Sequence, residues 1–416
     1  MEKMRILWVK AGKLFPVNTG GRIRTVNILH NLAARNDVTV FSYYQGTRDQ
    51  SYEKELSRHF PNSTLIAINT PGNGSPRLQR SLHYLSKLLL PSPYAVSQFN
   101  SRAVRRVLRE HLQSGRFDVA VCDFMAATLN FPTDLPTPTV LFQHNVEAAL
   151  WRRQSKTGAN PIARLAFILE AAKMNRYESK AIGKFDHVVA VSEHDRRLMG
   201  EMSDVLITVV PTGVDFINFS RETTPPGEDP IVVFTGAMDW EANIDGIEFF
   251  CKEIWPRILV EIPEAKLQIV GREPVTRVKN LKSATVEVTG TVPSILAYLE
   301  KAAVVIVPLR IGGGTRLKIY EAMAMGKAIV STSIGAEGLD VHPDQDIVLA
   351  DEPIEFAHRV TELLRDRDLR IKYGNEAVNT VSRYDWKVIS KRFEQVLATT
   401  VALRISRVPS KETGQD

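Results

Sequence analysis

Residues 304–339 read VVIVPLRIGGGTRLKIYEAMAMGKAIVSTSIGAEGL, and they contain the features of one βαβ unit. The β-branched run Val304 to Val307 predicts a buried strand, which leads into three consecutive glycines, Gly312 to Gly314. A helical pattern opens near Thr315, which can cap the helix, and a second apolar run follows at Ala328 to Ser331. This order predicts two parallel strands of one sheet joined by a crossover helix.

The glycines and the start of this helix predict a binding site for a diphosphate. Glycine lets the backbone approach a ligand closely, and the free amides of a first helical turn favour an anion. Arg316 and Lys318 place two cations at the same helix end, where they oppose the helix dipole unless a phosphate is bound there. The alternative is a plain turn with solvated cations, because a glycine run without the G-x-x-x-x-G-K-[ST] spacing of an ATPase loop is weak evidence. The predicted phosphate-binding residues are Gly312, Gly313, Gly314, Thr315, Arg316 and Lys318.

Three further positions are candidates for binding the same ligand. Glu321 lies six residues after Thr315, inside the helix, where a carboxylate could accept hydrogen bonds from a ribose diol; a solvated helix acid is the alternative. Gly236 and Arg272 each follow a predicted strand, at the carboxyl edge where open parallel sheets bind ligands. For Arg272 a solvated loop cation is an equally good interpretation.

The alternation of apolar runs with helical patterns extends outward over the whole chain and predicts an α/β fold with parallel sheets. The pattern restarts after TTPPGEDP at 223–230, which separates two halves. We therefore expect two α/β/α domains, residues 1–205 and 206–384, with a C-terminal helix at about 385–405 that packs back on the first. The expected ligand site is a cleft between them. The predicted strands are 6–9, 38–43, 64–68, 119–122, 139–142, 188–191, 231–234, 267–270, 286–288, 304–307, 328–331 and 347–349.

Composition excludes several classes of protein. The chain has 416 residues, 44% hydrophobic and 24% charged, as expected of a globular protein rather than a disordered or collagen-like one. Its only cysteines, Cys122 and Cys251, are too far apart in sequence for a disulfide framework or a zinc site of paired ligands. No apolar run approaches the roughly 18 residues of a membrane span, and the charged first residues lack a signal-peptide core. These features predict a cytoplasmic protein.

Charge is distributed unevenly along the chain. Residues 1–210 hold 28 Lys and Arg against 17 Asp and Glu, whereas the remainder holds 25 against 30. Residues 76–116 are the most basic part, with eight cations, one acid and many interspersed leucines and aromatics. This mixture predicts a segment that lies on an anionic membrane surface; an amphipathic core helix with solvated arginines is the alternative. No nucleic-acid motif accompanies the basic half, so nucleic acid is not an expected partner.

Residues 308–339 resemble the C-terminal signature of the group 1 glycosyl transferases, family 4 of the retaining glycosyltransferases with the GT-B fold. The similarity is greatest to the branch associated with exopolysaccharide sugar transferases. Further matching segments are collinear and span most of the chain, which makes the set more specific than any one of them. They are GGRIRTVNILHNLA (20–33), LFQHNVEAALWRR (141–153), VVAVSEHDRRLM (188–199), VPTGVD (210–215), FTGAMDWEANIDGI (234–247) and VTGTVPSILAYLEKA (288–302).

The resemblance implies a nucleotide-sugar donor bound mainly by the second domain and a lipid-linked or saccharide acceptor held by the first, with no cofactor and no metal. His144 matches the family's interdomain histidine, thought to contact the donor sugar and the leaving phosphate; a buried structural histidine is the alternative. The resemblance makes His144, Arg316 and Lys318 the catalytic candidates. Gly20 and Gly21 match the first-domain glycine loop, Glu321 would bind the ribose, and Thr291 and Val292 would meet the base through their backbone.

The chain departs from the family pattern at three places. The first of the family's paired glutamates is replaced by Gly313, which leaves the sugar identity open. Ala237 to Trp240 and Asn243 stand where many members have an arginine and a lysine, so Arg316 and Lys318 would carry the phosphate charge. The common N-G-V-D reads Thr212, Gly213, Val214 and Asp215, and this aspartate is either a hinge residue or a turn residue.

These matches predict an enzyme that transfers a sugar with retention at the anomeric carbon, in cell-surface or exopolysaccharide biosynthesis. A nucleotide-sugar epimerase on the same fold, or a silent sugar-nucleotide-binding scaffold, are the alternatives. The missing glutamate at Gly313 motivates the scaffold interpretation.

Overall fold

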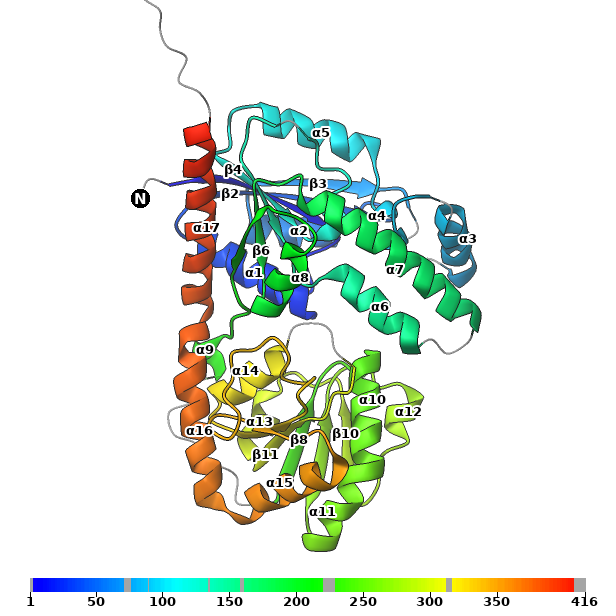
Figure 1. Ribbon diagram of the computed structural model, residues 1–416, viewed down its shortest axis with the longest axis vertical. Helices are drawn as coiled ribbons and strands as arrows, with labels where there is room; N and C mark the ends of the chain where they lie inside the picture. Colours follow the sequence, from blue (N-terminus) through cyan, green and yellow to red (C-terminus); the bar gives the residue numbers. More distant parts are fainter. Residues whose placement is uncertain are drawn as a thin grey trace, which may run out of the picture. The chain divides into compact units, whose positions relative to one another are not determined.

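The computed structural model describes residues 3–70, 76–88, 90–133, 135–157, 161–219, 229–311 and 316–407. Contacts within the chain separate two compact units, Met1–Pro211 with Ile389–Asp416, and Thr212–Val388. Each unit contains one parallel sheet between helices (Figure 1). The α/β class that the strand pattern predicts is therefore confirmed for both units.

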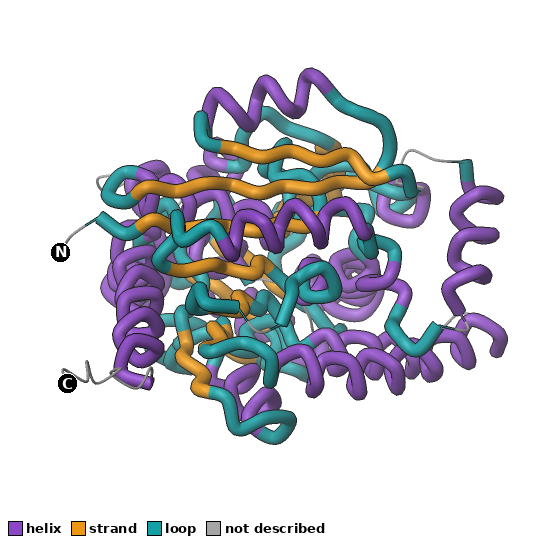
Figure 2. Tube along the Cα trace, turned by 90° about the horizontal axis from the view of Figure 1, so that it is seen from above, coloured by secondary structure: helices purple, strands orange, loops and turns teal. Residues whose placement is uncertain are grey.

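The first unit contains a seven-stranded parallel sheet in the order β3-β2-β1-β4-β5-β6-β7, and its strands lie side by side between helices (Figure 2). The order reverses beside β1, because the chain adds β2 on one side and β4 on the other. Such a switch point opens a crevice at the carboxyl edge of a parallel sheet. The strands are β1 (Arg5–Ala11), β2 (Asp37–Gln45), β3 (Ser63–Ile68), β4 (Val119–Asp123), β5 (Thr139–Phe142), β6 (His187–Ala190) and β7 (Leu206–Val209).

The helices of this unit bury apolar stripes against the sheet. In α5 the Ser101 hydroxyl accepts from the Val104 amide at the N-terminus, and Val104, Leu108 and Leu112 are fully buried one turn apart. The helices are α1 (Gly20–Ala33), α2 (Gln50–His59), α3 (Arg77–Leu88), α4 (Tyr94–Ser97), α5 (Arg102–Gln113), the 3₁₀ turn η1 (Met125–Ala127), α6 (Glu147–Thr157), α7 (Pro161–Ile182), α8 (Glu193–Gly200) and, from Ile389 onward, α17 (Trp386–Arg407).

The second unit contains a six-stranded parallel sheet in the order β10-β9-β8-β11-β12-β13. Its strands are β8 (Ile231–Thr235), β9 (Lys266–Val270), β10 (Val286–Gly290), β11 (Val304–Val307), β12 (Ala328–Ser331) and β13 (Val348–Leu349). Its helices are α9 (Phe216–Phe219), α10 (Glu241–Phe249), the π turn η2 (Phe250–Ile254), α11 (Trp255–Glu261), α12 (Thr276–Lys279), α13 (Leu296–Lys301), α14 (Leu317–Ala324), α15 (Pro353–Arg365), α16 (Arg367–Val381) and the 3₁₀ turn η3 (Ser382–Tyr384).

The βαβ unit expected from residues 304–339 is β11, α14 and β12, and its two strands pair in parallel. The described helix begins at Leu317 with Arg316 as its N-cap, and Thr315 lies outside the described residues. Among the residues that the structure describes, no helix is both long and apolar enough to cross a bilayer.

Candidate active site

Asp123 is the centre of a buried polar cluster at the carboxyl edge of the first sheet. It ends β4, is completely buried, and accepts hydrogen bonds from side chains on three neighbouring elements. The donors are Trp8 Nε1 (3.0 Å) and Lys10 Nζ (2.9 Å) on β1, Thr25 Oγ1 (2.8 Å) on α1, and His144 Nε2 (2.8 Å) after β5. Burial opposes ionisation, but Lys10 and His144 hold the pKa of Asp123 well below its usual value. The cluster therefore contains a buried carboxylate with a full set of donors.

His144 is fixed by this carboxylate and is neutral at pH 7. Burial lowers its pKa to about 4, although Asp123 favours the charged form. A carboxylate only accepts hydrogen bonds, so Nε2 carries the proton and Nδ1 is left as an acceptor. A Cβ on Gly21 would lie 3.4 Å from this Nδ1, and the Phe142 ring packs on the other side with centroids 4.4 Å apart. The structure thus brings together His144 and the predicted Gly20–Gly21 start of α1.

Arg24, one turn further along α1, is a second buried cation beside the cluster. Its guanidinium is almost fully buried, and Nε and Nη1 have no hydrogen-bond partner in the described part of the chain. Burial lowers its pKa to about 10, with Asp195 and Asp123 opposing the shift. Two buried guanidinium nitrogens without an acceptor are costly, so stability alone does not explain Arg24.

The segment after His144 is held by Glu178 of α7. The buried Glu178 carboxylate accepts from the amides of Glu147 (3.0 Å) and Ala148 (2.8 Å) and from Gln143 Nε2 (3.0 Å). These bonds cap the first turn of α6. Burial raises the pKa of Glu178 to about 7 and that of Glu147 to about 8, in the second case with repulsion from Glu178.

Four residues of this cluster and its surroundings are not predicted from the sequence: Asp123, Lys10, Arg24 and Glu178. Lys10 and Asp123 carried a usable signal, because each is a charged residue that closes an apolar strand of a predicted parallel sheet. The register pairs these two residues directly across β1 and β4. Arg24 and Glu178 had no such signal in the sequence, since each lies in a helix whose buried face is visible only after folding.

In the second unit, Lys318 of α14 reaches the end of β8. Its Nζ donates to Asn243 Oδ1 at 2.8 Å and lies 4.4 Å from the centre of the Phe234 ring. A Cβ on Gly236 would come within 2.8 Å of the same Nζ, so a side chain at this position would displace the Lys318 ammonium. Burial and the neighbouring Arg316 lower the pKa of Lys318 to about 7. The charged ammonium is thus disfavoured relative to the neutral amine.

Arg316, the N-cap of α14, and Glu321 of the same helix flank Lys318. The nearly buried Arg316 donates from Nη2 to the Ile334 carbonyl at 3.0 Å and lies 3.9 Å from Glu337 Oε2. Burial raises the pKa of Glu321 to about 7, and Lys318 opposes that shift. The structure therefore brings Gly236, Arg316, Lys318 and Glu321 into one neighbourhood.

The other predicted donor-binding residues lie at the same sheet edge. Gly271 and Gly236 approach so closely after β9 and β8 that a Cβ on Gly271 would lie 1.6 Å from the Gly236 carbonyl oxygen. Arg272 follows β9 and forms an ion pair with Asp239 at 3.5 Å. Thr291 and Val292 follow β10, with Thr291 exposed and Val292 half-buried. Gly312, Gly313, Gly314 and Thr315 lie outside the described residues.

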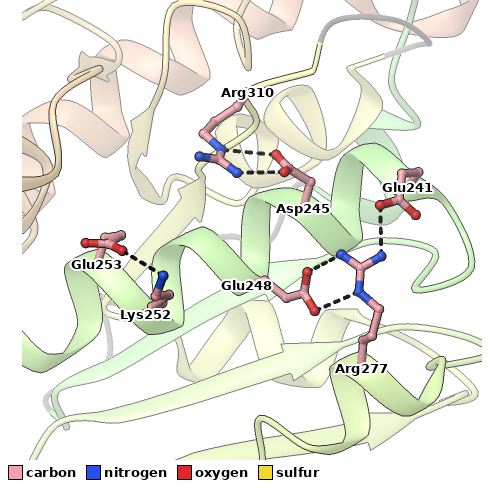
Figure 3. Close-up of polar contacts among 7 residues, drawn as sticks. All are labelled: Glu241, Asp245, Glu248, Lys252, Glu253, Arg277 and Arg310. Carbon is pink, nitrogen blue, oxygen red and sulfur yellow. Dashed lines mark hydrogen bonds and ion pairs between the residues drawn. The ribbon is translucent and has the colours of Figure 1, made fainter. Parts of the chain in front are cut away.

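Charges on the outer face of α10 are paired separately from this neighbourhood (Figure 3). Arg310 Nη2 contacts Asp245 Oδ1 at 2.6 Å, and Arg277 bridges Glu241 and Glu248. These pairs are partly exposed and resemble an ordinary solvated helix face. The described residues contain no group of three or more His, Cys, Asp or Glu placed to hold a metal ion.

Two protein-family models match this chain. The model described as Glycosyltransferase Family 4 matches residues 19–216, and the model described as Glycosyl transferases group 1 matches residues 229–366. Together they cover most of both units. The fold and these matches define a glycosyltransferase with the GT-B fold. The chain belongs to the group 1 glycosyl transferases, as its motifs predict.

Two curated relatives illustrate the range of this family. An uncharacterized 44.6 kDa protein in the cps region of Klebsiella pneumoniae is 23% identical over 86% of this chain and 90% of its own length. The phosphatidyl-myo-inositol mannosyltransferase of Mycolicibacterium smegmatis is 27% identical over 54% of this chain and 58% of its own.

Solved structures share the fold at low identity. Sucrose-phosphate synthase of Thermosynechococcus elongatus is 16% identical, with a TM-score of 0.70 over 96% of this chain and all of that one. Anabaena HepE, solved in complex with UDP-glucose, is 14% identical, with a TM-score of 0.63 over 95% of this chain and all of that one. At these identities the likeness shows the GT-B fold alone.

Proposed function

We propose that this glycosyltransferase moves a sugar from a nucleoside diphosphate to an acceptor hydroxyl with retention at the anomeric carbon. The observation that carries the proposal is Lys318, buried against Asn243 and Gly236 with a pKa of about 7 and with Arg316 beside it. Two neighbouring cations held partly out of water repel one another. A diphosphate between them would relieve that repulsion.

Lys318 also accounts for the departure from the family pattern at Asn243. Where many family members have a lysine after the first strand, this chain has an amide that accepts a hydrogen bond from Lys318. The cation thus reaches the end of β8 from α14 instead of α10. In the proposed reaction an oxocarbenium-like transition state builds charge on the leaving diphosphate, and Arg316, Lys318 and the α14 amides stabilise that charge. We propose that these groups act without a metal ion or resident cofactor, and that the leaving phosphate takes the acceptor proton.

His144 fits a role toward the sugar rather than toward the phosphate. With Nε2 donating to Asp123, its free Nδ1 can accept a hydrogen bond from a hydroxyl but cannot donate one to a phosphate oxygen. We propose that Nδ1 orients a donor-sugar hydroxyl beside Gly21. Asp123 is then a positioning residue, since it fixes the tautomer of the histidine.

The finer substrate assignment is drawn from the compared proteins. UDP-glucose is bound by HepE, which makes UDP the first nucleotide to test. One relative is encoded in a cps region and another is named for a membrane lipid acceptor. We propose a lipid-linked or polysaccharide intermediate of surface polysaccharide synthesis as the acceptor.

The test begins with thermal stabilisation of the purified chain by UDP, GDP, ADP and their sugars, because a ligand selective for the folded state raises the melting temperature. The nucleotide selected is then used with Arg316→Ala, with Arg277→Ala as a matched arginine control on the exposed face. We expect Arg316→Ala to keep its fold and to lose on the order of 10²-fold in turnover. Wild-type turnover in a folded Arg316→Ala protein would contradict the assignment. Donor binding with no transfer to any acceptor would favour a silent scaffold, and a new sugar nucleotide without an acceptor would favour an epimerase.

A further inference from the structure

Arg24 of α1 is a buried cation that the residues around it do not satisfy. Only 2% of the residue is exposed, and its Nε and Nη1 have no hydrogen-bond partner in the part of the chain that the structure describes. Folded proteins rarely leave buried donors without an acceptor, because each one costs free energy. An arginine kept in this state is a candidate for binding a ligand.

Two carboxylates attract Arg24, but neither bonds its free nitrogens. Each oxygen of Asp123 already accepts two hydrogen bonds from other side chains of the cluster, which fills the lone-pair positions of a carboxylate. Asp195 of α8 is only partly buried, and its Oδ2 accepts from the Ser192 hydroxyl at 2.7 Å. Both carboxylates therefore act on Arg24 through charge alone.

The buried cluster holds more positive charge than it balances. Lys10 is paired with Asp123 at 2.9 Å, and His144, with a pKa of about 4, is neutral at pH 7. Arg24, with a pKa of about 10, is a second cation at that pH. Two buried cations thus face one buried carboxylate. A water molecule could accept from Arg24 but could not neutralise it, whereas a ligand group with a single negative charge would do both.

His144 lies on the same side of α1 as Arg24. A Cβ on Gly21 would be 3.4 Å from His144 Nδ1, so the Gly21 side of the helix meets the imidazole. Arg24 follows Gly21 by three residues, which places it on the same helix face, and helical side chains lean toward the N-terminus. The charge of Arg24 accordingly lowers the pKa of His144. An acceptor for a hydroxyl and a donor for an anion therefore lie close together.

We propose that Arg24 and His144 recognise a hexuronate, a sugar whose carboxylate binds Arg24 while a ring hydroxyl donates to His144 Nδ1. The inference deepens the proposed function and rests on it, because it names the class of sugar that the enzyme handles. A carboxylate carries one negative charge, and its planar shape matches a guanidinium. A phosphate monoester carries up to two charges and would exceed the charge that the cluster lacks. Either the donor sugar or the acceptor saccharide supplies the carboxylate, and the test separates the two sources.

The donor arm of the test measures by calorimetry the affinity of the full chain for two matched pairs, UDP-glucuronic acid with UDP-glucose and GDP-mannuronic acid with GDP-mannose. We expect the acid of one pair to bind on the order of tenfold more tightly than the neutral sugar. Arg24→Met should abolish this preference and leave the affinity for the nucleoside diphosphate alone unchanged. The matched control is Arg22→Met on the same helix, because Arg22 donates to the Pro16 carbonyl and to Asn18. This control should keep the preference.

The acceptor arm titrates methyl glucuronide and methyl glucoside, each with and without the nucleoside diphosphate. A preference for the glucuronide that Arg24→Met removes would assign the carboxylate to the acceptor. A preference confined to the donor pairs would assign it to the donor sugar. Both results support the proposal.

Melting temperatures separate loss of recognition from loss of fold. Without ligand, Arg24→Met should melt at or above the wild type, because an apolar side chain replaces an unsatisfied buried cation. Should it not fold, Arg24→Lys keeps the charge but loses the planar group, and it should narrow the preference. The proposal is overturned if the wild type prefers the acid in neither arm, or if a folded Arg24→Met or Arg24→Lys protein keeps the full preference.

The outcomes also distinguish this inference from the proposed function. Nucleotide binding without any preference for a carboxylate would remove the inference and keep the proposed function. A glucuronide preference that depends on Arg24, without a response to any nucleotide, would do the reverse.

Discussion

At the residue scale, Asp123 and Asp118 provide a matched comparison of one buried and one partly exposed carboxylate. Asp123 is surrounded by four donors at complete burial, whereas Asp118 pairs with Arg5, half of whose side chain is exposed. Replacing Asp123 by Asn leaves Lys10 uncompensated in a buried cluster, which should lower the free energy of unfolding by about 3–5 kcal/mol. Asp118→Asn should cost less than about 1 kcal/mol. Urea unfolding of both variants measures the difference, and equal losses would contradict the central role given to Asp123.

Lys318 and Glu321 together predict how donor binding depends on pH. Burial lowers the pKa of Lys318 and raises that of Glu321, each to about 7. Below pH 7 Glu321 must lose a proton before both of its oxygens can accept from a ribose diol, and above pH 7 Lys318 must gain one to pair with phosphate. Affinity should therefore be highest near pH 7 and fall by up to about tenfold per pH unit on either side. Calorimetric titration with UDP-glucose from acid to alkaline pH measures this profile.

Single variants separate the two sides of that profile. Lys318→Met should remove the fall above pH 7 and keep the fall below it, and Glu321→Gln should do the opposite. A wild-type affinity that is flat across the range, together with measurable binding, would show that neither group changes its proton on binding the donor.

At the scale of elements, α14 is held in place by α16 through a contact between two glycines. A Cβ on Gly374 of α16 would lie 2.1 Å from the carbonyl oxygen of Gly326, which follows α14 with a positive φ of 63°. Gly374→Ala must therefore push the two helices apart, at about 1–3 kcal/mol. Gly200→Ala, at the end of α8 with no atom within 4 Å, should be neutral or slightly stabilising. Thermal unfolding of both variants is the measurement. An unchanged melting temperature for Gly374→Ala would show that α16 does not fix α14.

Elements are also the level at which the sequence was most informative. The runs at 304–307 and 328–331 coincide with β11 and β12, because fully buried parallel strands are continuous β-branched segments. The motif around Arg316 and Lys318 was visible for the same reason, as a local pattern. The partner of Lys318 was not visible in the sequence. Asn243 stands where many family members have a lysine, and only the fold shows its Oδ1 2.8 Å from Lys318 Nζ. Asp123 was missed because its four donors come from three separate parts of the chain, and only tertiary packing makes them neighbours.

At the scale of the whole molecule, the first unit is not continuous in sequence. Its sheet is built from residues 5–209, but α17 from the end of the chain completes its core. The Phe393 ring packs on Trp8 and Phe142, with ring centroids 5.4 and 5.0 Å apart. The Glu394 carboxylate accepts hydrogen bonds from the side chains of Arg35 and Asn36. His187 and Thr400 form a further side-chain hydrogen bond. Trp8 and Phe142 flank the Asp123 cluster, so this packing connects the last helix to the proposed sugar-binding histidine.

Phe393→Ala should therefore destabilise the first unit, although Phe393 lies far in sequence from the strands of that unit's sheet. Removal of the buried ring leaves a cavity against Trp8 and Phe142, which should lower the free energy of unfolding by about 3–5 kcal/mol. Leu403→Ala, on an exposed position of the same helix, should stay within about 0.5 kcal/mol of the wild type. Calorimetry with UDP, which lacks the sugar proposed to meet His144, can assign the effect, because UDP should raise the transition of the unit that holds Lys318 and leave the other where it was. We expect Phe393→Ala to lower only the transition that the nucleotide does not move. A fall in the nucleotide-sensitive transition instead would place the stabilising role of α17 in the second unit.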